Sequence, residues 1–294
     1  MKRLSVIIVT YNSEKDIYDC LSSVFAHNDI GDNLEVIIVD NCSSKFEEMR
    51  SKIEAEYGSN VVIIKNTENG GYGQGNNIGV RKASAPVVAI MNPDVRIVTP
   101  IFAQALETLC EGNIVMCAGK QMYDLTHPAL SFNTSLFLPP FIRFALRYYG
   151  IKKDKYLQQY MWLQGAFFFI RKDVFEQIGM FDENIFMFSE EFDIHTRLLK
   201  QYQNVKIKYL KSYQYLHLAG DREFSLKTYE RQLNTGIYLA RKFGFPIKKF
   251  LKREKRHRHI VDIVSKLKKD NKHNNQYQQI SALINQYLNN NEYA

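Results

Sequence analysis

Two places in the sequence carry carboxylates that could do chemistry. The first is Asp94, which follows an apolar run and a proline in the segment Met91-Asn-Pro-Asp-Val95. A carboxylate that leaves a buried strand at a turn can hold a divalent cation, and the cation can neutralise a diphosphate. A single aspartate after a strand is also common as a turn residue or a helix cap, so this position alone leaves both interpretations open.

The second place is the pair Glu190 and Glu191, which follows a Phe-rich segment and begins a predicted helix that also contains Asp193 and Arg197. Acidic residues in a first helical turn interact favourably with the helix dipole, and this structural role would explain one or two of them. Adjacent carboxylates beside an aromatic surface are also typical of a general base, because burial and like charge raise the pKa of one member. The pair is therefore a candidate for proton transfer.

A glycine-rich segment, residues 69–79, could approach a ligand closely through its backbone. It lacks the GxGxxG spacing because Ile78 stands where the third glycine would be, and it lacks the Lys and the Ser or Thr of a Walker loop. A dinucleotide oxidoreductase and a P-loop NTPase are therefore disfavoured. A structural glycine turn is the alternative.

Four short apolar runs predict the strands that position these residues, namely 5–9, 36–39, 61–64 and 87–91. Unbroken β-branched runs of this length are typical of strands buried on both faces of a parallel sheet. Between them, helical periodicity predicts helices over 13–25, 47–57 and 76–83. The alternation predicts a doubly wound α/β layer, in which ligands bind at the carboxyl ends of the strands. The residues expected there are Thr10, Tyr11, Asn12, Asp40, Asn41, 69–75, Asn92, Pro93 and Asp94.

Beyond residue 100 the pattern changes to mixed helices and short strands. The aromatic, proline-containing segment 132–149 is typical of a lid or of an insertion that faces an acceptor. Near the C-terminus a terminal pair of helices could be formed by Leu267, Ile280, Leu283, Ile284 and Leu288.

Composition limits the class of protein. The chain has 294 residues, of which 45% are hydrophobic and 24% charged, and this excludes disorder of the whole chain. It has neither a signal-peptide pattern nor an apolar run of the roughly 18 residues that cross a membrane, so we expect a cytosolic protein. Its four cysteines form no CxxC pair or zinc spacing, which predicts reduced thiols and no zinc site.

Much of the net charge of +8 lies in one basic patch. Such a patch could attract an anionic membrane surface or phosphorylated substrates, whereas nucleic acid is disfavoured because no recognition motif accompanies the charge. A solvated helix face is the alternative. The patch consists of Arg241, Lys242, Lys248, Lys249, Lys252, Arg253, Lys255, Arg256 and Arg258.

Together, in this order and spacing, the segments resemble the family 2 glycosyltransferases. The resemblance covers about residues 4–240 and is carried by SVIIVTYNS, VDNCS, NGGYGQGNNIG, MNPDV, GAFFFIRKDVFEQIGMFDE and the Ser-Glu-Glu-Phe-Asp run. Within the family, the segments are most similar to the rhamnosyltransferase type that builds bacterial surface polysaccharides. The resemblance implies a glycosyltransferase A fold, which is a Rossmann-like mixed sheet flanked by helices, here with a C-terminal helical extension.

The resemblance also implies how the chain is divided. A catalytic domain would span 1–240, with 1–99 binding the nucleotide and 100–240 binding the acceptor. A basic, helical extension would span 241–294, and it could hold the enzyme at the inner face of the cell membrane.

Roles for individual residues follow from the same resemblance. The acceptor would contact Trp162 and Glu190, and Glu191 would be the general base that deprotonates the acceptor hydroxyl. Asp94, together with His217, would hold Mg²⁺ or Mn²⁺; a packed core histidine is the alternative for His217. The nucleotide-sugar would be bound by Thr10, Tyr11, Asn12, Asp40, Asn41, Gly70, Asn76, Asn92, Asp94, Gln164 and Gly165.

Three positions depart from the family pattern. Asn92 replaces the first carboxylate of the DxD motif, which removes one ligand from the expected metal site. Asn76 stands where many members have an arginine, so one cationic contact to the nucleotide is missing. Glu191 replaces the usual aspartate and is one methylene longer, and Glu190 is kept as the less favoured base.

We therefore expect an inverting glycosyltransferase that moves a sugar from a donor such as dTDP-rhamnose or a UDP-sugar to a saccharide or a lipid-linked saccharide. One alternative is a sugar nucleotidyltransferase, which would carry a glycine-rich loop with Arg and Lys after the first strand, whereas Thr10-Tyr-Asn-Ser13 contains no glycine. The other alternative is a noncatalytic saccharide-binding or membrane-docking protein of the same fold. Such a protein would not need Asp94 and Glu191.

Overall fold

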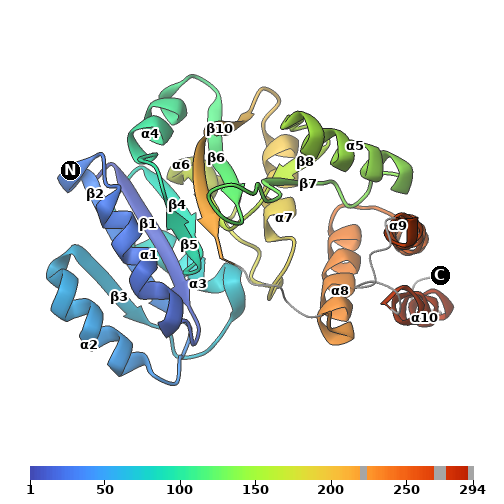
Figure 1. The fold of residues 1–294 in the computed structure, drawn as a ribbon, viewed down its shortest axis with the longest axis horizontal. Helices are drawn as coiled ribbons and strands as arrows, with labels where there is room; N and C mark the ends of the chain where they lie inside the picture. Colours follow the sequence, from blue (N-terminus) through green and yellow to red (C-terminus); the bar gives the residue numbers. More distant parts are fainter. Residues whose placement is uncertain (219–223, 268–275, 291–294) are drawn as a thin grey trace. The chain divides into compact units, whose positions relative to one another are not determined.

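A computed structural model of the chain describes residues 1–218, 224–267 and 276–290 (Figure 1). The chain forms two compact units. The first, which we call the sheet unit, contains Met1–Phe132, Leu163–Phe186 and Glu190–Gly220. The second, the helical unit, contains Asn133–Trp162, Met187–Ser189 and Asp221–Ala294. Ala219 and Gly220, the end of the segment around His217, lie outside the described residues.

The sheet unit is built on an eight-stranded sheet with the order β3-β2-β1-β4-β9-β6-β10-β5. The first four strands in this order pair in parallel; β9 is antiparallel to both of its neighbours, and β10 is parallel to β6 but antiparallel to β5. The mixed sheet that the resemblance implies is therefore confirmed. The strands are β1 Leu4–Thr10, β2 Leu34–Asp40, β3 Val61–Lys65, β4 Val87–Met91, β5 Val95–Ile97, β6 Ile114–Met122, β9 Phe167–Arg171 and β10 Lys206–His217.

The four strands predicted from apolar runs are all present. The predicted burial on both faces holds for β1, β2 and β4, whereas β3 lies at the edge of the sheet and Val62, Ile63 and Ile64 are only partly buried. Ile7, Ile8, Ile37, Ile38 and Ile90 have no exposed surface, as expected for strands covered on both faces. The helices and single 3-10 turns of this unit are α1 Glu14–Ala26, η1 Gly31–Asn33, α2 Phe46–Tyr57, η2 Gly58–Asn60, α3 Gly71–Lys82, α4 Phe102–Cys110, α6 Lys172–Gln177 and α7 Glu190–Gln201.

The glycine-rich segment differs from the prediction, because α3 begins at Gly71 and not at residue 76. Glycine is a poor helix former, but here the helix packs so closely on β1 that side chains would not fit. A Cβ atom at position 75 would lie 2.8 Å from Val9 Cγ1, and one at Gly79 would overlap Ile7. The close backbone approach predicted for this segment is therefore in part an approach to the protein's own sheet.

The helical unit contains α5 Pro140–Lys153, α8 Leu226–Lys242, α9 Ile247–Leu267 and α10 Gln276–Asn289. The predicted terminal pair of helices is present, because α10 packs on α9 and buries Ile280, Leu283 and Ile284, with Leu288 against them. Leu267 was wrongly included in that pair: it ends α9 and is 79% exposed. Two further short strands, β7 Phe132–Thr134 and β8 Met161–Leu163, pair with each other.

A buried ion cluster lies inside the helical unit around Glu254 of α9. This carboxylate accepts hydrogen bonds from Arg143 of α5 at 2.8 Å, from Arg258 at 2.8 Å and from the Tyr229 hydroxyl of α8 at 3.2 Å. Burial opposes ionisation, yet the charges of Arg258 and Arg143 hold the pKa of Glu254 well below its usual range. The cluster thus joins three helices of the unit.

All four cysteines are free, as predicted. Within the described residues, no helix has the length and apolar composition needed to cross a membrane.

Candidate active site

The carboxyl ends of β1 and β2 meet at Asp40, which is completely buried. Thr10 lies opposite Asp40 in the strand register, and its hydroxyl donates to Asp40 Oδ2 at 2.9 Å. Ser43 donates to both carboxylate oxygens, through its N–H at 2.8 Å and its hydroxyl at 2.5 Å. Asp40 therefore organises the loop that follows β2.

The loops after β1 and β2 are joined into one rigid surface. Asn12 has a left-handed φ of 51°, which asparagine tolerates better than most residues. Its N–H donates to Ser43 Oγ at 2.8 Å, and its Oδ1 accepts from the N–H of Ser44 at 3.0 Å. Tyr11 is 52% exposed beside this network. An exposed aromatic ring next to a rigid polar loop can stack on a nucleobase.

Asn41 ties these loops to α3, because its Nδ2 donates to Gly71 O at 2.9 Å. Gly70 lies immediately before the helix, at its N-cap position. Asn76 is completely buried, and its Nδ2 donates to Tyr72 O at 2.9 Å. The predicted nucleotide-binding residues of this segment therefore lie at or inside the first turns of one helix.

Asp94 and His217 come together although they are far apart in the sequence. β5 pairs with β10 so that Val95 lies opposite His217, and Leu218 N donates to Asp94 O at 2.9 Å. Asp94 Oδ1 then lies 3.3 Å from His217 Nε2, and both side chains are largely buried. Tertiary pairing of two strands, which the sequence does not reveal, creates this contact.

The carboxylate of Glu191 packs directly against the backbone of Gly165, so closely that any side chain at 165 would overlap it. The hydroxyl of Tyr72 donates to Gly165 O at 2.8 Å from the other direction. Tyr72 is itself held by its N–H, which donates to Phe186 O at 3.1 Å, and by edge contact of its ring with Phe181. A side chain at position 165 would therefore displace the Glu191 carboxylate from the place it occupies.

Three carboxylates gather around Tyr72. Burial and then the negative charges of Glu191, Glu190 and Asp94, with Tyr215 as a further contribution, raise the pKa of the Tyr72 hydroxyl well above its usual value. Residues from α3, α7 and the turn after β4 therefore share one electrostatic environment in the sheet unit. Sequence analysis did not single out Tyr72, although an aromatic hydroxyl within a glycine-rich segment could have drawn attention to it.

The protonation of Glu191 is suited to proton transfer near neutral pH. Burial raises the pKa of its carboxyl from 4.5 to about 7, and its own backbone N–H offsets part of this effect. A carboxylate with such a pKa is a stronger base than an exposed one and is still ionised in a large fraction of molecules at neutral pH.

The other predicted site residues lie around this centre or in the helical unit. Glu190 is 3% exposed, so it is more deeply buried than its neighbour Glu191. Asn92 N donates to Ala166 O at 2.8 Å, and Gln164 N donates to Ser131 O at 3.0 Å. Trp162 belongs to the helical unit, where it is buried and its indole N–H donates to Thr134 O at 3.3 Å.

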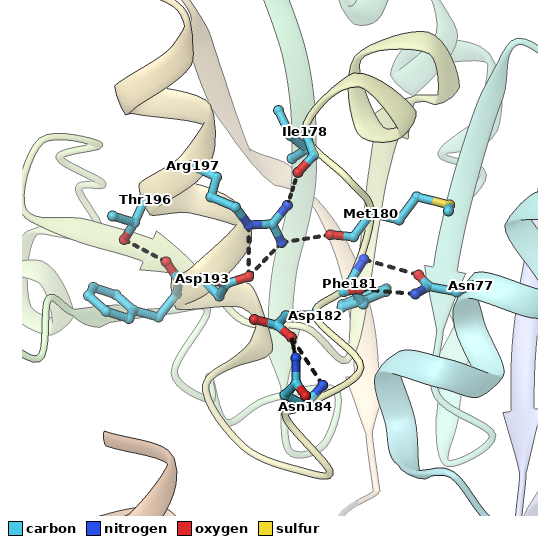
Figure 2. Close-up of polar contacts among 10 residues, drawn as sticks. Asn77, Ile178, Met180, Phe181, Asp182, Asn184, Asp193, Thr196 and Arg197 are labelled. Atoms are coloured by element: carbon cyan, nitrogen blue, oxygen red, sulfur yellow. Dashed lines mark hydrogen bonds and ion pairs between the residues drawn. The ribbon is translucent and has the colours of Figure 1, made fainter. Parts of the chain in front are cut away.

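Arg197 and Asp193 of α7, which the sequence placed only near a helix start, clamp the segment before the helix (Figure 2). Arg197 binds Asp193 Oδ2 at 2.8 Å and 2.5 Å, and it donates to Ile178 O and, at 2.6 Å, to Met180 O. Asp193 is completely buried, so its role exceeds a favourable interaction with the helix dipole. The Asp–Arg spacing of four residues on a helix was the available signal.

A second clamp holds the same segment from α3. Asn77 donates to Phe181 O and accepts from Phe181 N, both at 3.0 Å (Figure 2). Directly before α7, Phe188 and Ser189 have left-handed φ values of 80° and 66°. Such strained backbone at a bulky residue is costly and is concentrated at functional sites.

The donor set suits a divalent cation that is shared with a substrate. Among the described residues, no group of three or more His, Cys, Asp or Glu side chains could hold a metal ion by itself. Asp94 Oδ1 and His217 Nε2 supply one oxygen and one nitrogen ligand that already face each other. Mg²⁺ in phosphate-binding enzymes commonly takes one or two carboxylates and completes its coordination with substrate phosphates and water.

Comparison with known proteins decides the family. The model of the family described as Glycosyl transferase family 2 matches residues 5–179, more than half of the 294-residue chain. The chain belongs to glycosyl transferase family 2. The resemblance inferred from its motifs is therefore confirmed at the level of the family.

Among relatives of this family 2 chain, the low-salt glycan biosynthesis hexosyltransferase Agl10 of Haloferax volcanii is 27% identical over 213 residues, which are 69% of this chain and 63% of Agl10. The chain thus spans less than two thirds of the length of that relative. The rhamnosyltransferase WbbL of Escherichia coli K12 is 26% identical over 268 residues, 81% of this chain and 92% of WbbL.

Solved structures show the same fold. The mannosyltransferase PcManGT of Pyrobaculum calidifontis, in complex with GDP-Man and Mn²⁺, has a TM-score of 0.57 at 14% identity over 96% of this chain and 69% of PcManGT. At this identity the likeness concerns the fold alone. The predicted glycosyltransferase A type of fold is thereby confirmed for this family 2 member.

Proposed function

We propose that this chain is an inverting glycosyltransferase in which Glu191 is the general base. The acceptor hydroxyl oxygen would form a bond to the anomeric carbon of the donor sugar while the bond from that carbon to the nucleoside diphosphate breaks. The hydroxyl proton would pass to Glu191, and the diphosphate would leave with the electron pair. A base on one face of the sugar and charge stabilisation on the other are the requirements of such a single displacement.

One observation carries the proposal. The Glu191 carboxylate lies on Gly165, a backbone position that the family places against the donor sugar, and it shares the environment of Tyr72 with Asp94. A proton acceptor and a candidate cation ligand thus lie in one polar centre. A noncatalytic saccharide-binding protein would not require that juxtaposition.

The donor would be a nucleoside diphosphate sugar, such as dTDP-rhamnose or a UDP-sugar. The loops organised by Asp40 would bind the nucleoside, with the exposed ring of Tyr11 available for stacking. Asp94 and His217 would hold Mg²⁺ or Mn²⁺, which, when bound, would supply positive charge to the leaving diphosphate. WbbL, a rhamnosyltransferase by name, supports rhamnose as the first sugar to test.

The acceptor would be a saccharide or a lipid-linked saccharide in glycan synthesis, met at the inner face of the cell membrane. The basic residues of 241–259 would attract anionic lipid at about 1 kcal/mol for each charge near the surface. The structure narrows this patch, because Arg253 and Arg258 bind inside the helical unit to Phe137 O and Glu254. The exposed members that remain include Lys248, Lys249, Lys252 and Arg256.

Glu191→Gln tests the catalytic proposal. The amide is almost isosteric with the carboxylate but cannot take up a proton, so transfer should fall by about 10²- to 10⁴-fold while donor affinity stays nearly unchanged. Turnover at saturating donor and acceptor is measured alongside donor binding by calorimetry.

Glu190→Gln is the matched control, since it makes the same chemical change at the neighbouring position, about 100° away around the helix. It should lower turnover much less. If Glu190→Gln is inactive and Glu191→Gln active, the base is misassigned by one residue. If both keep full turnover, the acidic pair has no catalytic role. A noncatalytic saccharide-binding protein would not hydrolyse the donor, so a donor-hydrolysis assay without acceptor distinguishes it from the proposed enzyme.

A further inference from the structure

Helix α5 exposes a continuous apolar face. Phe141 is 74% exposed, Tyr148 59%, Ile142 43% and Tyr149 39%, which is unusual for four large apolar side chains on one helix. Exposed single apolar residues are normal on protein surfaces, but contiguous ones mark an interaction site.

The geometry of the helix explains the exposure. At about 100° per residue, the exposed apolar positions 141, 142, 145, 148 and 149 fall on one side of α5 together with Lys152, whereas exposed Arg147 lies on another side. Arg143 and Gly150 are buried on the opposite side, where Arg143 enters the ion cluster of Glu254 and joins α5 to α9. The buried side thus fixes α5 on the helical unit and leaves the aromatic side turned away from it.

The charged residues of α5 itself are all basic. α5 contains no acidic residue and carries Lys152 and Lys153 in its last turn. On α9, the acidic residues Glu254 and Asp262 are both buried and ion-paired, so they add no exposed negative charge. The exposed surface of α9 is instead cationic, with Lys248, Lys249, Lys252 and Arg256.

We propose that α5 docks on the surface of an anionic lipid bilayer, with Phe141, Ile142, Tyr148 and Tyr149 inserted at the boundary of headgroups and acyl chains. An apolar face on a helix that also carries exposed basic residues, here Lys152 and Lys153, is the pattern of interfacial helices, which are buried about 5–10 Å into this boundary. Tyrosine rings favour this level, since one end of the ring is apolar and the other polar. Two copies of this chain would bring like charges together, so self-association through this face is opposed.

This inference rests on the membrane attraction proposed above and deepens it, because charge alone would hold the protein near lipid without inserting it. Anionic lipid supplies both complements of the face, negative headgroups and an apolar interior. An acidic protein partner would supply the charge, and its binding is one outcome of the test.

Sedimentation of the full chain with phosphatidylcholine vesicles, with and without phosphatidylglycerol, tests the proposal. Phe141→Ser/Tyr148→Ser should lower partitioning onto anionic vesicles by about 10-fold or more, because each side chain buries apolar area on insertion. Tyr123→Ser/Leu125→Ser is the matched control, since these residues are 58% and 71% exposed but lie in the sheet unit. It should bind as the original chain does.

A second variant reports insertion directly. The chain has one tryptophan, Trp162, which is buried and therefore shielded from a quencher in the lipid. Phe141→Trp should add emission that shifts to shorter wavelength on anionic vesicles and is quenched by brominated lipid. Neither change should occur in the original chain.

The outcomes separate the proposals. If Phe141→Ser/Tyr148→Ser binds vesicles like the original chain, if the Phe141→Trp emission is not quenched, or if the original chain does not bind vesicles, insertion of α5 is refuted. If the original chain forms a dimer that the double variant loses, and does not bind vesicles, this face is an interface between copies and the proposal is overturned. Binding only to an acidic protein would overturn it as well.

The triple variant Lys248→Gln/Lys249→Gln/Lys252→Gln tests charge attraction separately, because it should lose vesicle binding at low salt. The Glu191 proposal is tested with Glu191→Gln and a water-soluble acceptor in the absence of vesicles, so its failure is distinguished from failure of the α5 proposal.

Discussion

Two glutamates on helices, one in each unit, show how surroundings decide what a carboxylate does. Glu254 of the helical unit is bound by Arg143, Arg258 and Tyr229, and its pKa lies well below the usual range despite burial. Glu191 of the sheet unit packs on the uncharged backbone of Gly165, and burial raises its pKa to about 7. The first is held ionised for structure, and the second is free to exchange a proton.

The difference separates a carboxylate that belongs to the fold, Glu254, from one that is suited to proton transfer, Glu191. A buried ion pair contributes little net stability when it forms, but it becomes costly when one partner is removed. A desolvated carboxylate costs stability whenever it is ionised, and this cost is the source of its basicity. Four measurements test how the surroundings of these buried carboxylates determine what they do.

The largest expected effect is on stability in the helical unit. Glu254→Gln should lower the free energy of unfolding by about 3–5 kcal/mol, because it leaves the buried Arg143 and the partly buried Arg258 without their counter-charge. Fluorescence of Trp162, the single tryptophan and a member of this unit, reports the transition in urea. Asp262→Asn is the control, since Asp262 is also buried but, among the described residues, its ion pair is with Lys266, which is 57% exposed. A loss below about 1 kcal/mol for Glu254→Gln would mean that the Glu254 carboxylate is not needed for the stability of the helical unit.

The next effect is on the pH dependence of transfer. Since burial raises the pKa of Glu191 to about 7, kcat/KM should rise with pH below that value and level off above it. Each pH unit below 7 should lower the rate about tenfold, so that pH 5 costs roughly 100-fold. Rates measured from pH 5 to pH 9 check this. A profile that stays flat down to pH 5 would mean that another group takes the proton.

The same shift predicts a gain in stability when the base is removed. The folded protein binds the Glu191 proton more tightly than the unfolded chain, so this group's contribution is favourable below pH 4.5 and is lost as pH rises towards 7. Glu191→Gln should therefore raise the free energy of unfolding at pH 8 by about 1–2 kcal/mol, after allowance for solvent screening of a half-buried group. The gain should vanish near pH 4.5, and urea unfolding followed by circular dichroism measures both. Equal gains at the two pH values would point to packing and not to charge.

The smallest expected effect is on nucleotide-sugar affinity, when Asp94 is changed. Asp94→Asn should weaken nucleotide-sugar binding about 3- to 10-fold more in Mg²⁺ or Mn²⁺ than in EDTA, because the carboxylate acts through the cation. Calorimetric titration in both conditions provides the test. Equal weakening with and without metal would contradict the metal role of Asp94 and leave only its contact with His217.

The sequence by itself determined the elements whose signals are local. The runs at 5–9, 36–39 and 87–91 are strands because β-branched residues without polar alternation must be covered on both faces, and 61–64 is a partly buried edge strand of the same type. The terminal pair of helices followed from apolar spacing in the same way, apart from Leu267. The motifs identified the family, and with it the two carboxylates worth examining, Asp94 and Glu191.

Only the tertiary structure decided how those carboxylates are surrounded. The sequence predicted a loop at the glycines of residues 71–75, because glycine disfavours helices. In the structure they belong to α3, where the lack of side chains allows close packing on β1. Glu254 lies within the basic stretch of the sequence, and only the packing of α5, α8 and α9 makes it the buried centre of an ion cluster. Contacts such as those of Glu191 with Gly165 and Asp94 with His217 join residues that are distant in the chain. Such contacts depend on strand order and helix docking, and the pKa of a carboxyl depends on its neighbours in space. Residue types and spacing alone therefore predict neither the contacts nor the pKa.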